Sequence, residues 1–181
     1  SRSAEQAREL DETLGLRRLA SIAGNRASPG FMAATLAWIS QHQPHVLEQA
    51  RYALLPKDYL RLRLTGEVAT EPSDASASLL FDIGSGQWSQ ELVGAVGIDM
   101  GILPPIVPSA SVAGRLCTSA AEQMGLLPGT PVVAGAGDQA AQAVGNGIIT
   151  GDAASSTIGT GGQLLQPCSS PSPDPELRVH C

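Results

Sequence analysis

Aromatic and basic residues are both scarce in this chain, and each scarcity argues against a class of protein. Phe, Trp and Tyr make up 3% of the 181 residues, and 11 Lys and Arg are outnumbered by 17 Asp and Glu. The net charge of -6 argues against a nucleic-acid partner, because such partners are bound by clustered Lys and Arg. The hydrophobic share of 43% is large enough to bury a core, so we do not expect wholesale disorder.

Cysteines and long apolar runs are also few. Cys117, Cys168 and Cys181 are an odd number at wide spacing, and they form neither a metal-binding pattern nor a disulfide framework, which indicates a reducing compartment. No apolar run approaches the length that crosses a bilayer, and the charged start lacks the apolar region of a signal peptide. We therefore expect a cytoplasmic protein without a membrane partner.

The two ends indicate a piece of a longer protein. The chain starts in helix-like sequence without a Met, and its last residues alternate apolar and polar side chains with no closing turn. A length of 181 residues suits one domain, or one domain and part of another. We expect the central portion of a larger enzyme.

Glycine and proline are plentiful, with 20 and 13 copies, and they divide the chain into short elements of the kind found in α/β enzymes. Amphipathic spacing and helix-start signals predict a series of helices, and apolar runs predict strands. The run at 131–135 is typical of a buried parallel strand. The expected helices span 3–19, 29–43, 56–66, 73–81, 88–96, 117–127 and 140–144, and the expected strands span 52–55, 131–135, 153–158 and 163–166.

The strongest local feature is the junction that runs from Gly135 to Gln139, between a predicted strand and a predicted helix. Ligands in α/β folds bind at the carboxyl ends of strands, so Asp138 is a candidate to meet a substrate hydroxyl. The alternative is that Asp138 only caps the helix. The helix dipole favours the ionised carboxylate by about 0.3–1 kcal/mol, which keeps it charged without making it a strong base.

The same junction matches the G-x-G-x-x-A spacing of a dinucleotide-binding fingerprint, with Gly135, Gly137 and Ala140. An NAD-binding domain of an oxidoreductase is therefore an alternative. The position of Asp138 argues against it, because a carboxylate directly after the second glycine would repel a pyrophosphate.

A second candidate is the turn Gly159-Thr160-Gly161-Gly162 between two predicted strands. Its backbone N–H groups and the Thr160 hydroxyl could hold phosphate oxygens, although an ordinary hairpin turn has the same composition. It is not a P-loop, because no Gly-Lys-Ser/Thr follows and Lys57, the single lysine, lies far upstream.

Two further polar residues have a structural and a functional interpretation. Asp74 follows Ser73 at a predicted helix start, where capping explains it. Arg26 precedes another helix start and could reach an anionic or hydroxylated ligand, although a surface arginine explains it equally simply.

Three segments carry a resemblance to a known family. Residues 54–66 (LLPKDYLRLRLTG), 131–145 (PVVAGAGDQAAQAVG) and 156–162 (STIGTGG) resemble the FGGY carbohydrate kinases, and among them the xylulokinase-like members. They occur in the order and at the spacing of that family. Together they place nearly the whole chain in the middle third of such an enzyme.

The resemblance implies an α/β fold of the actin-like, ribonuclease-H-like ATPase class, incomplete in this chain. Residues 1–148 would belong to the N-terminal, sugar-binding domain, and residues 149–181 would start the C-terminal, ATP-binding domain, with the boundary near 147–151. The implied reaction is transfer of a phosphoryl group from ATP with Mg²⁺ to a ketopentose, D-xylulose. A homodimer is common among similar enzymes, and the chain alone would be inactive.

The resemblance also assigns roles to particular residues. Asp138 matches the base that activates the sugar hydroxyl, and Gln139 matches a sugar contact that is often Asn in similar enzymes. Arg26 matches a substrate-contacting arginine of some members. Gly159, Thr160 and Gly161 match the turn near the ATP phosphates. A non-catalytic sugar-binding module that kept the kinase fold remains a second alternative.

Overall fold

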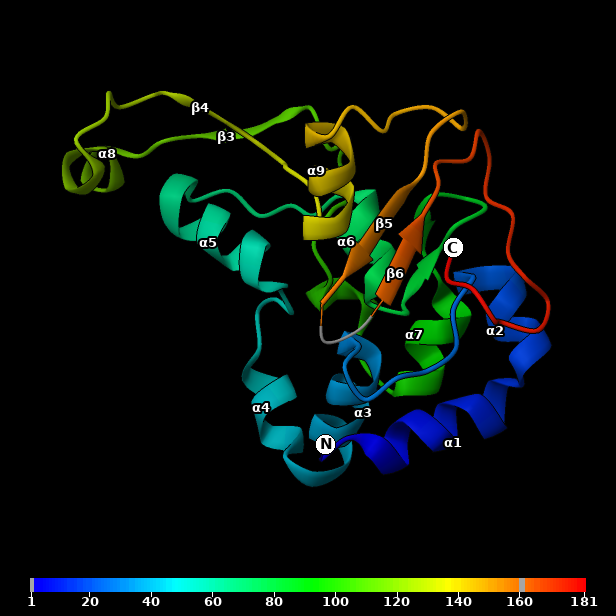
Figure 1. The fold of residues 1–181 in the computed structure, drawn as a ribbon. Helices are drawn as coiled ribbons and strands as arrows, with labels where there is room; N and C mark the ends of the chain where they lie inside the picture. Colours follow the sequence, from blue (N-terminus) through cyan, green and yellow to red (C-terminus); the bar gives the residue numbers. More distant parts are fainter. Residues whose placement is uncertain (1, 160–161) are drawn as a thin grey trace.

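The computed structural model describes residues 2–159 and 162–181. Helices are more extensive than strands in this part, and its strands form three separate antiparallel pairs (Figure 1). The helices are α1 (Ala4–Leu14), α2 (Leu16–Ala23), α3 (Met32–His42), α4 (Pro44–Gln49), α5 (Pro56–Thr65), α6 (Pro72–Ala77), α7 (Gln90–Val96), α8 (Thr118–Met124) and α9 (Asp138–Gly145), with a 3-10 turn at Met100–Ile102. The strands are β1 (Phe81–Asp82), β2 (Gln87–Trp88), β3 (Val112–Arg115), β4 (Pro131–Val133), β5 (Ser155–Ile158) and β6 (Gly162–Leu165).

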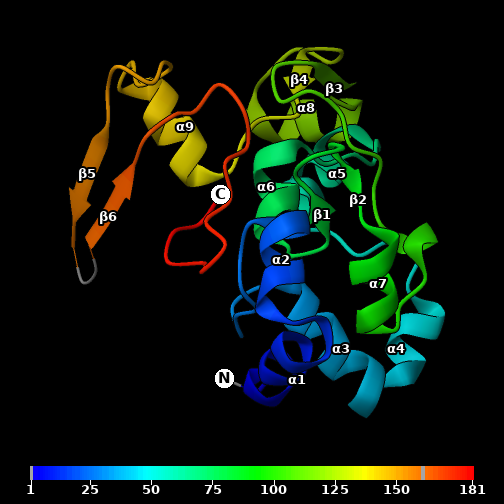
Figure 2. The same cartoon turned by 90° about the vertical axis from the view of Figure 1, so that its right-hand side faces the viewer.

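The hydrophobic core lies where α1, α2, α3 and α7 meet (Figure 2). Leu19 and Leu92 are almost fully buried there, and the small side chains of Ala23 and Ala34 let the helices approach closely. Each buried leucine contributes roughly 1.5–3 kcal/mol relative to an exposed one. We call α1, α2, α3 and α7, packed around this core, the helical body.

The single helix predicted over 3–19 is wrong, because the chain forms α1 and α2 with Gly15 between them. Gly15 has φ +76 and ψ 142, which no helix continues through. The break turns α2 so that Leu19 and Ile22 reach the core. The next helix, α3, starts at Met32 and not at Pro29.

The helix predicted over 73–81 is also shorter than expected. It ends at Ala77, and Leu79 takes a left-handed φ of 64 that leads into the hairpin β1–β2. Phe81 pairs with Trp88 across this hairpin, and their ring centroids lie 6.4 Å apart in an edge-to-face arrangement. Trp88 therefore lies in β2, and the following helix α7 begins after Ser89, whose hydroxyl accepts from the Leu92 N–H and caps the helix.

An arm formed by α5, α8, β3 and β4 extends to one side of the helical body (Figure 1). Helix α5 has the predicted ends, with Pro56 in its first turn and the left-handed Gly66 after its last residue. Strand β4 forms as predicted, but it pairs antiparallel with β3 and is mostly exposed. An apolar run such as 131–135 favours burial, but it does not determine which strand lies beside it or in which direction that strand runs. The parallel pairing expected from this run is therefore wrong. The segment 52–55 forms no strand.

After α9 the chain forms the hairpin β5–β6, which runs alongside that helix in both views (Figures 1 and 2). The final segment then returns to the helical body. Leu177 is buried in the core, and the Cys181 N–H donates to the Gly24 carbonyl at 3.2 Å. Within the described ranges, no helix combines the length and the apolar character that crossing a membrane requires.

Candidate active site

Asp138 lies where the sequence predicts it, just after a strand and at the start of a helix. The link Ala134–Gly137 joins β4 to α9, and Asp138 is the first residue of α9. Its side chain is exposed, and Oδ1 accepts a hydrogen bond from the Gln139 N–H at 2.7 Å. The N-cap position belongs to Gly137, so capping does not account for Asp138.

The link has a backbone conformation that requires glycine. Gly135 has φ +86, in the left-handed region that side chains disfavour. A Cβ at this position would lie 3.5 Å from the Lys57 side chain, which is an ordinary contact, so the backbone conformation and not the space accounts for the glycine. Gly135 therefore allows the backbone conformation that leads from β4 to Asp138. It does not serve a dinucleotide, because β4 is paired antiparallel with β3 and the βαβ unit of the NAD fingerprint is not formed.

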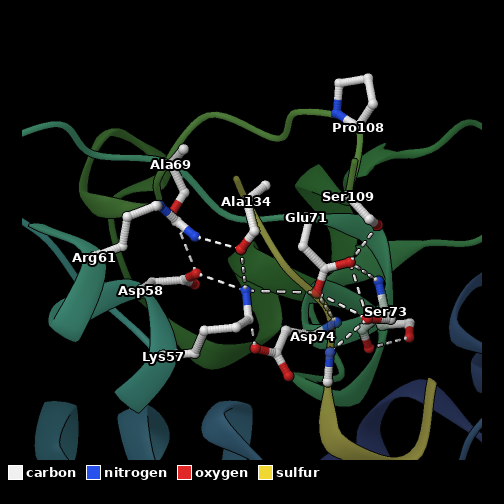
Figure 3. Close-up of polar contacts among 12 residues, drawn as sticks. Lys57, Asp58, Arg61, Ala69, Glu71, Ser73, Asp74, Pro108, Ser109 and Ala134 are labelled. Carbon is white, nitrogen blue, oxygen red and sulfur yellow. Dashed lines mark hydrogen bonds and ion pairs between the residues drawn. The ribbon is translucent and has the colours of Figure 1, made fainter. Parts of the chain in front are cut away.

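A group of charged side chains lies directly beneath the link (Figure 3). They come from α5 and from the start of α6, two elements separated in the sequence by the loop 66–71. We call them the charge cluster, and its members are Lys57, Asp58, Arg61, Glu71 and Asp74.

Arg61 fixes the first residue of the link. Its side chain is 3% exposed, and Nη1 donates to the Ala134 carbonyl at 2.7 Å. Nη2 donates to Asp58 Oδ1 at 2.9 Å and also to the Ala69 carbonyl. Asp58 itself is 1% exposed, so the pair is buried and each partner depends on the other.

Lys57 lies at the centre of the charge cluster. Its Nζ donates to Asp58 Oδ1 at 3.0 Å and to the Ala134 carbonyl at 3.3 Å. The same nitrogen lies 3.3 Å from Asp74 Oδ2 and 3.6 Å from Glu71 Oε1. One ammonium group thereby connects three carboxylates to the link.

Glu71 is fully buried and caps α6. Its carboxylate accepts from the Ser73 and Asp74 N–H groups, each at 2.9 Å, and from the Ser109 hydroxyl at 2.7 Å. Burial raises the pKa of Glu71, but the hydrogen bonds from Ser109 and from the start of α6 outweigh this and leave the pKa below its ordinary value. Glu71 is therefore a buried acceptor that stays ionised.

Ser73 connects Glu71 to the link. Its hydroxyl accepts from the Gly137 N–H at 2.8 Å and donates to the Glu71 carboxylate, whose oxygens lie 2.8 and 2.9 Å away. Asp74 lies beside it, and a Cβ on Gly137 would come 3.0 Å from Asp74 Oδ1. Burial raises the pKa of Asp74, although Lys57 opposes this. The interpretation of Asp74 as a helix cap is wrong, because Glu71 holds that position.

The other predicted site residues lie on different elements. Gln139 lines a shallow depression between α9 and the hairpin β5–β6, together with Gln142, Ala143, Ser155, Thr157, Gln163 and Leu165. Gly159 is exposed at the end of β5, and Thr160 and Gly161 lie outside the described residues. Arg26 lies in the loop after α2, where its Nη2 is 3.4 Å from Asp11 Oδ2. Gln139 thus lies beside the hairpin β5–β6, and Arg26 forms an ion pair with Asp11 of α1.

The charge cluster escaped the sequence prediction. Lys57 and Glu71 are separated by a loop, so periodicity did not connect them, and no role was predicted for Arg61. The signal that could have found them is the spacing of Asp58 and Arg61, three residues apart on one face of α5, which is the arrangement of an intrahelical ion pair.

Comparisons with known proteins give one result. Residues 1–145 match the model of the N-terminal domain of the FGGY family of carbohydrate kinases. The xylulose kinase of Escherichia coli K12 is 37% identical over 159 residues, which are 88% of this chain and 33% of that protein. The xylulose kinase of Bacillus subtilis 168 is 37% identical over 165 residues, which are 91% of this chain and 33% of that protein.

Solved structures agree with this result. The crystal structure of a xyloylose kinase from Brucella ovis matches with a TM-score of 0.91 at 37% identity, over 99% of this chain and 37% of that one. The xylulose kinase from Rhodospirillum rubrum matches with a TM-score of 0.90 at 27% identity, over 97% of this chain and 36% of that one. The fold is thus part of the actin-like ATPase fold, as predicted, and the chain spans about a third of the length of the curated relatives it matches. By sequence and by fold, this chain belongs to the FGGY family of carbohydrate kinases.

Proposed function

We propose that the full-length protein containing this chain is an ATP-dependent kinase that converts D-xylulose to D-xylulose 5-phosphate. The observation that carries the proposal is the carboxylate of Asp138, exposed at the start of α9 after a link that Arg61 and Ser73 hold in place. The similarity to relatives named xylulose kinase supports the choice of sugar.

In the proposed reaction Asp138 accepts the proton of one sugar hydroxyl. The oxygen of that hydroxyl forms a bond to the γ-phosphorus of ATP while the bond from this phosphorus to the ADP oxygen breaks, so that ADP leaves. General-base help of this kind is worth about 10²–10⁴-fold, and the remainder of such catalysis is positioning and stabilisation of charge. The exposed position of Asp138 leaves its second oxygen, Oδ2, available to a hydroxyl.

The other predicted residues take supporting roles in the proposal. Gln139 orients the sugar beside Asp138, and Arg26 contacts the substrate. Gly159, Thr160 and Gly161 contact the ATP phosphates. Mg²⁺ accompanies ATP in this proposal, and within the described residues no group of three or more His, Cys, Asp or Glu side chains is arranged to hold a metal ion.

Three further features belong to the same proposal. Residues 1–148 form part of the sugar-binding domain, and residues 149–181 begin the ATP-binding domain. The end of the family match at residue 145 supports this division. We also propose, on the resemblance to similar enzymes, that the full-length protein works as a homodimer in the cytoplasm.

The test is an ADP-release assay of the purified full-length protein with a panel of sugars. We expect D-xylulose to give the highest kcat/KM among D-xylulose, D-ribulose, glycerol and gluconate, the last two chosen because kinases named for them share this fold. Higher kcat/KM for another member of the panel would reassign the substrate. Saturable binding of NADH, together with no ADP release on any sugar, would instead support the oxidoreductase alternative.

A further inference from the structure

We propose that Ser73 is a positioning residue for Asp138. Its hydroxyl connects the buried carboxylate of Glu71 to the Gly137 N–H, and Gly137 directly precedes Asp138. This inference rests on the proposed function, in which Asp138 is the base. It adds a residue that touches neither sugar nor ATP and acts on the reaction through the backbone.

Glu71 determines which hydrogen bond the Ser73 hydroxyl donates and which it accepts. An ionised carboxylate only accepts hydrogen bonds, so the single hydroxyl hydrogen of Ser73 points at Glu71, 2.8 Å away. The lone pairs of the Ser73 oxygen are then free to face the Gly137 N–H at 2.8 Å. A hydroxyl that donates to a charged group is also a better acceptor, because hydrogen bonds in a chain polarise one another.

Ser73 holds the last part of the link before the base. Arg61 fixes the Ala134 carbonyl at 2.7 Å, and the Gly135 N–H donates to the Ser109 carbonyl at 3.0 Å. Gly137 is the N-cap residue of α9, and its N–H has no acceptor within that helix. The Ser73 hydroxyl therefore supplies the contact that sets the Gly137 peptide plane from which the first turn of α9 starts.

The fit around Gly137 leaves little freedom. A Cβ there would stand 3.0 Å from Asp74 Oδ1 and 3.5 Å from the Ser73 hydroxyl. The start of α9 thus packs directly on the start of α6, and a side chain at Gly137 would have to displace the Asp74 carboxylate. Loss of the Ser73 hydroxyl removes the acceptor from this packed position and lets the peptide rotate.

The expected consequence is a change in kcat with little change in KM. A catalytic group that is misplaced by about 1 Å can cost ~10²-fold in rate. A rotation of the peptide one residue before Asp138 moves the Asp138 carboxylate by a fraction of this distance. For Ser73→Ala in the full-length protein we therefore expect kcat to fall by roughly tenfold, with KM for the sugar within about twofold of the parent value.

The experiment compares three variants by steady-state kinetics and thermal unfolding. Ser73→Thr keeps a hydroxyl on the same carbon and is expected to restore kcat. Ser76→Ala is the matched control, because Ser76 lies on the same helix and donates to the Ser73 carbonyl without touching the link. It removes one hydroxyl from α6 and is expected to leave kcat unchanged.

Two outcomes decide the proposal. A folded Ser73→Ala protein with the parent kcat overturns it, as does an equal loss of kcat in Ser76→Ala. If Ser73→Ala does not fold, Ser73→Cys makes the same test, because a thiol of similar size is a weak acceptor. Asp138→Asn, assayed in parallel, separates the two hypotheses: if that variant keeps its turnover the proposed function fails, whatever Ser73 does.

Discussion

Arg61 donates from Nη1 to the Ala134 carbonyl at 2.7 Å and thereby joins two residues that are 73 positions apart in the sequence. The contact ties α5 to the link that leads into α9, and the guanidinium is balanced by the buried Asp58. The segment 54–66, which carries part of the family resemblance, therefore supports the segment 131–145, which contains Asp138.

Replacing Arg61 by Met is expected to destabilise the full-length protein by about 3–5 kcal/mol, because it leaves the Asp58 carboxylate buried without its partner. Urea denaturation followed by circular dichroism measures the loss. Arg63→Met is the matched control, since Arg63 is exposed on the same helix and bonds only to the Tyr59 hydroxyl among its described contacts. We expect that control to change the free energy of unfolding by no more than about 0.5 kcal/mol.

Replacing Asp138 by Asn is expected to lower kcat by about 10²–10⁴-fold, because the amide cannot accept the hydroxyl proton, while KM for the sugar changes little. Steady-state kinetics with the preferred sugar measure both constants. Asp152→Asn removes another exposed carboxylate, from the loop before β5, and is expected to retain the parent kcat. Near-parent turnover in Asp138→Asn would remove Asp138 from the role of base.

Replacing Gly135 by Ala is expected to destabilise the protein by about 1–3 kcal/mol, because alanine is strained at a left-handed backbone conformation. Gly145→Ala provides the contrast. Gly145 ends α9 without a positive φ, and a Cβ there meets no atom within 4 Å, so we expect it to be neutral or to stabilise by up to about 1 kcal/mol. Equal effects of the two substitutions in thermal unfolding would contradict the assignment of strain to Gly135.

Local signals predicted much of this structure from the sequence. Pro56 and Gly66 marked the two ends of α5, and Asp138 was placed correctly after β4. Each of these depends on residues within one or two turns of the chain, where capping and backbone preference decide the outcome.

The features that the sequence did not predict depend on contacts between distant segments. The pairing of β4 with β3 is decided by which strand lies beside it, and an apolar run carries no information on that. The charge cluster forms only when the start of α6 is brought against α5. The break at Gly15 is a milder case, because a glycine inside a periodic helix pattern can be tolerated or can end it.

Glu71 and Asp74 are expected to give the free energy of unfolding opposite dependences on pH. The pKa of Glu71 lies below its ordinary value of 4.5, so its contribution to stability is present above that pH and is lost as the pH falls through the pKa of the folded state. The pKa of Asp74 lies above its ordinary value of 3.8, so its contribution is present below that pH and is lost as the pH rises through the pKa of the folded state.

Urea denaturation between about pH 3 and pH 7, roughly the range in which carboxylates titrate, separates the two effects. The measurement compares the parent with the Glu71→Gln and Asp74→Asn proteins. The stability of the parent relative to Glu71→Gln should rise as the pH rises, because only the parent gains from ionising a carboxylate that its hydrogen bonds favour. The stability of the parent relative to Asp74→Asn should fall over the same window, because burial opposes the ionisation of Asp74. Parallel curves for the two variants would contradict the opposite roles assigned to these neighbouring carboxylates.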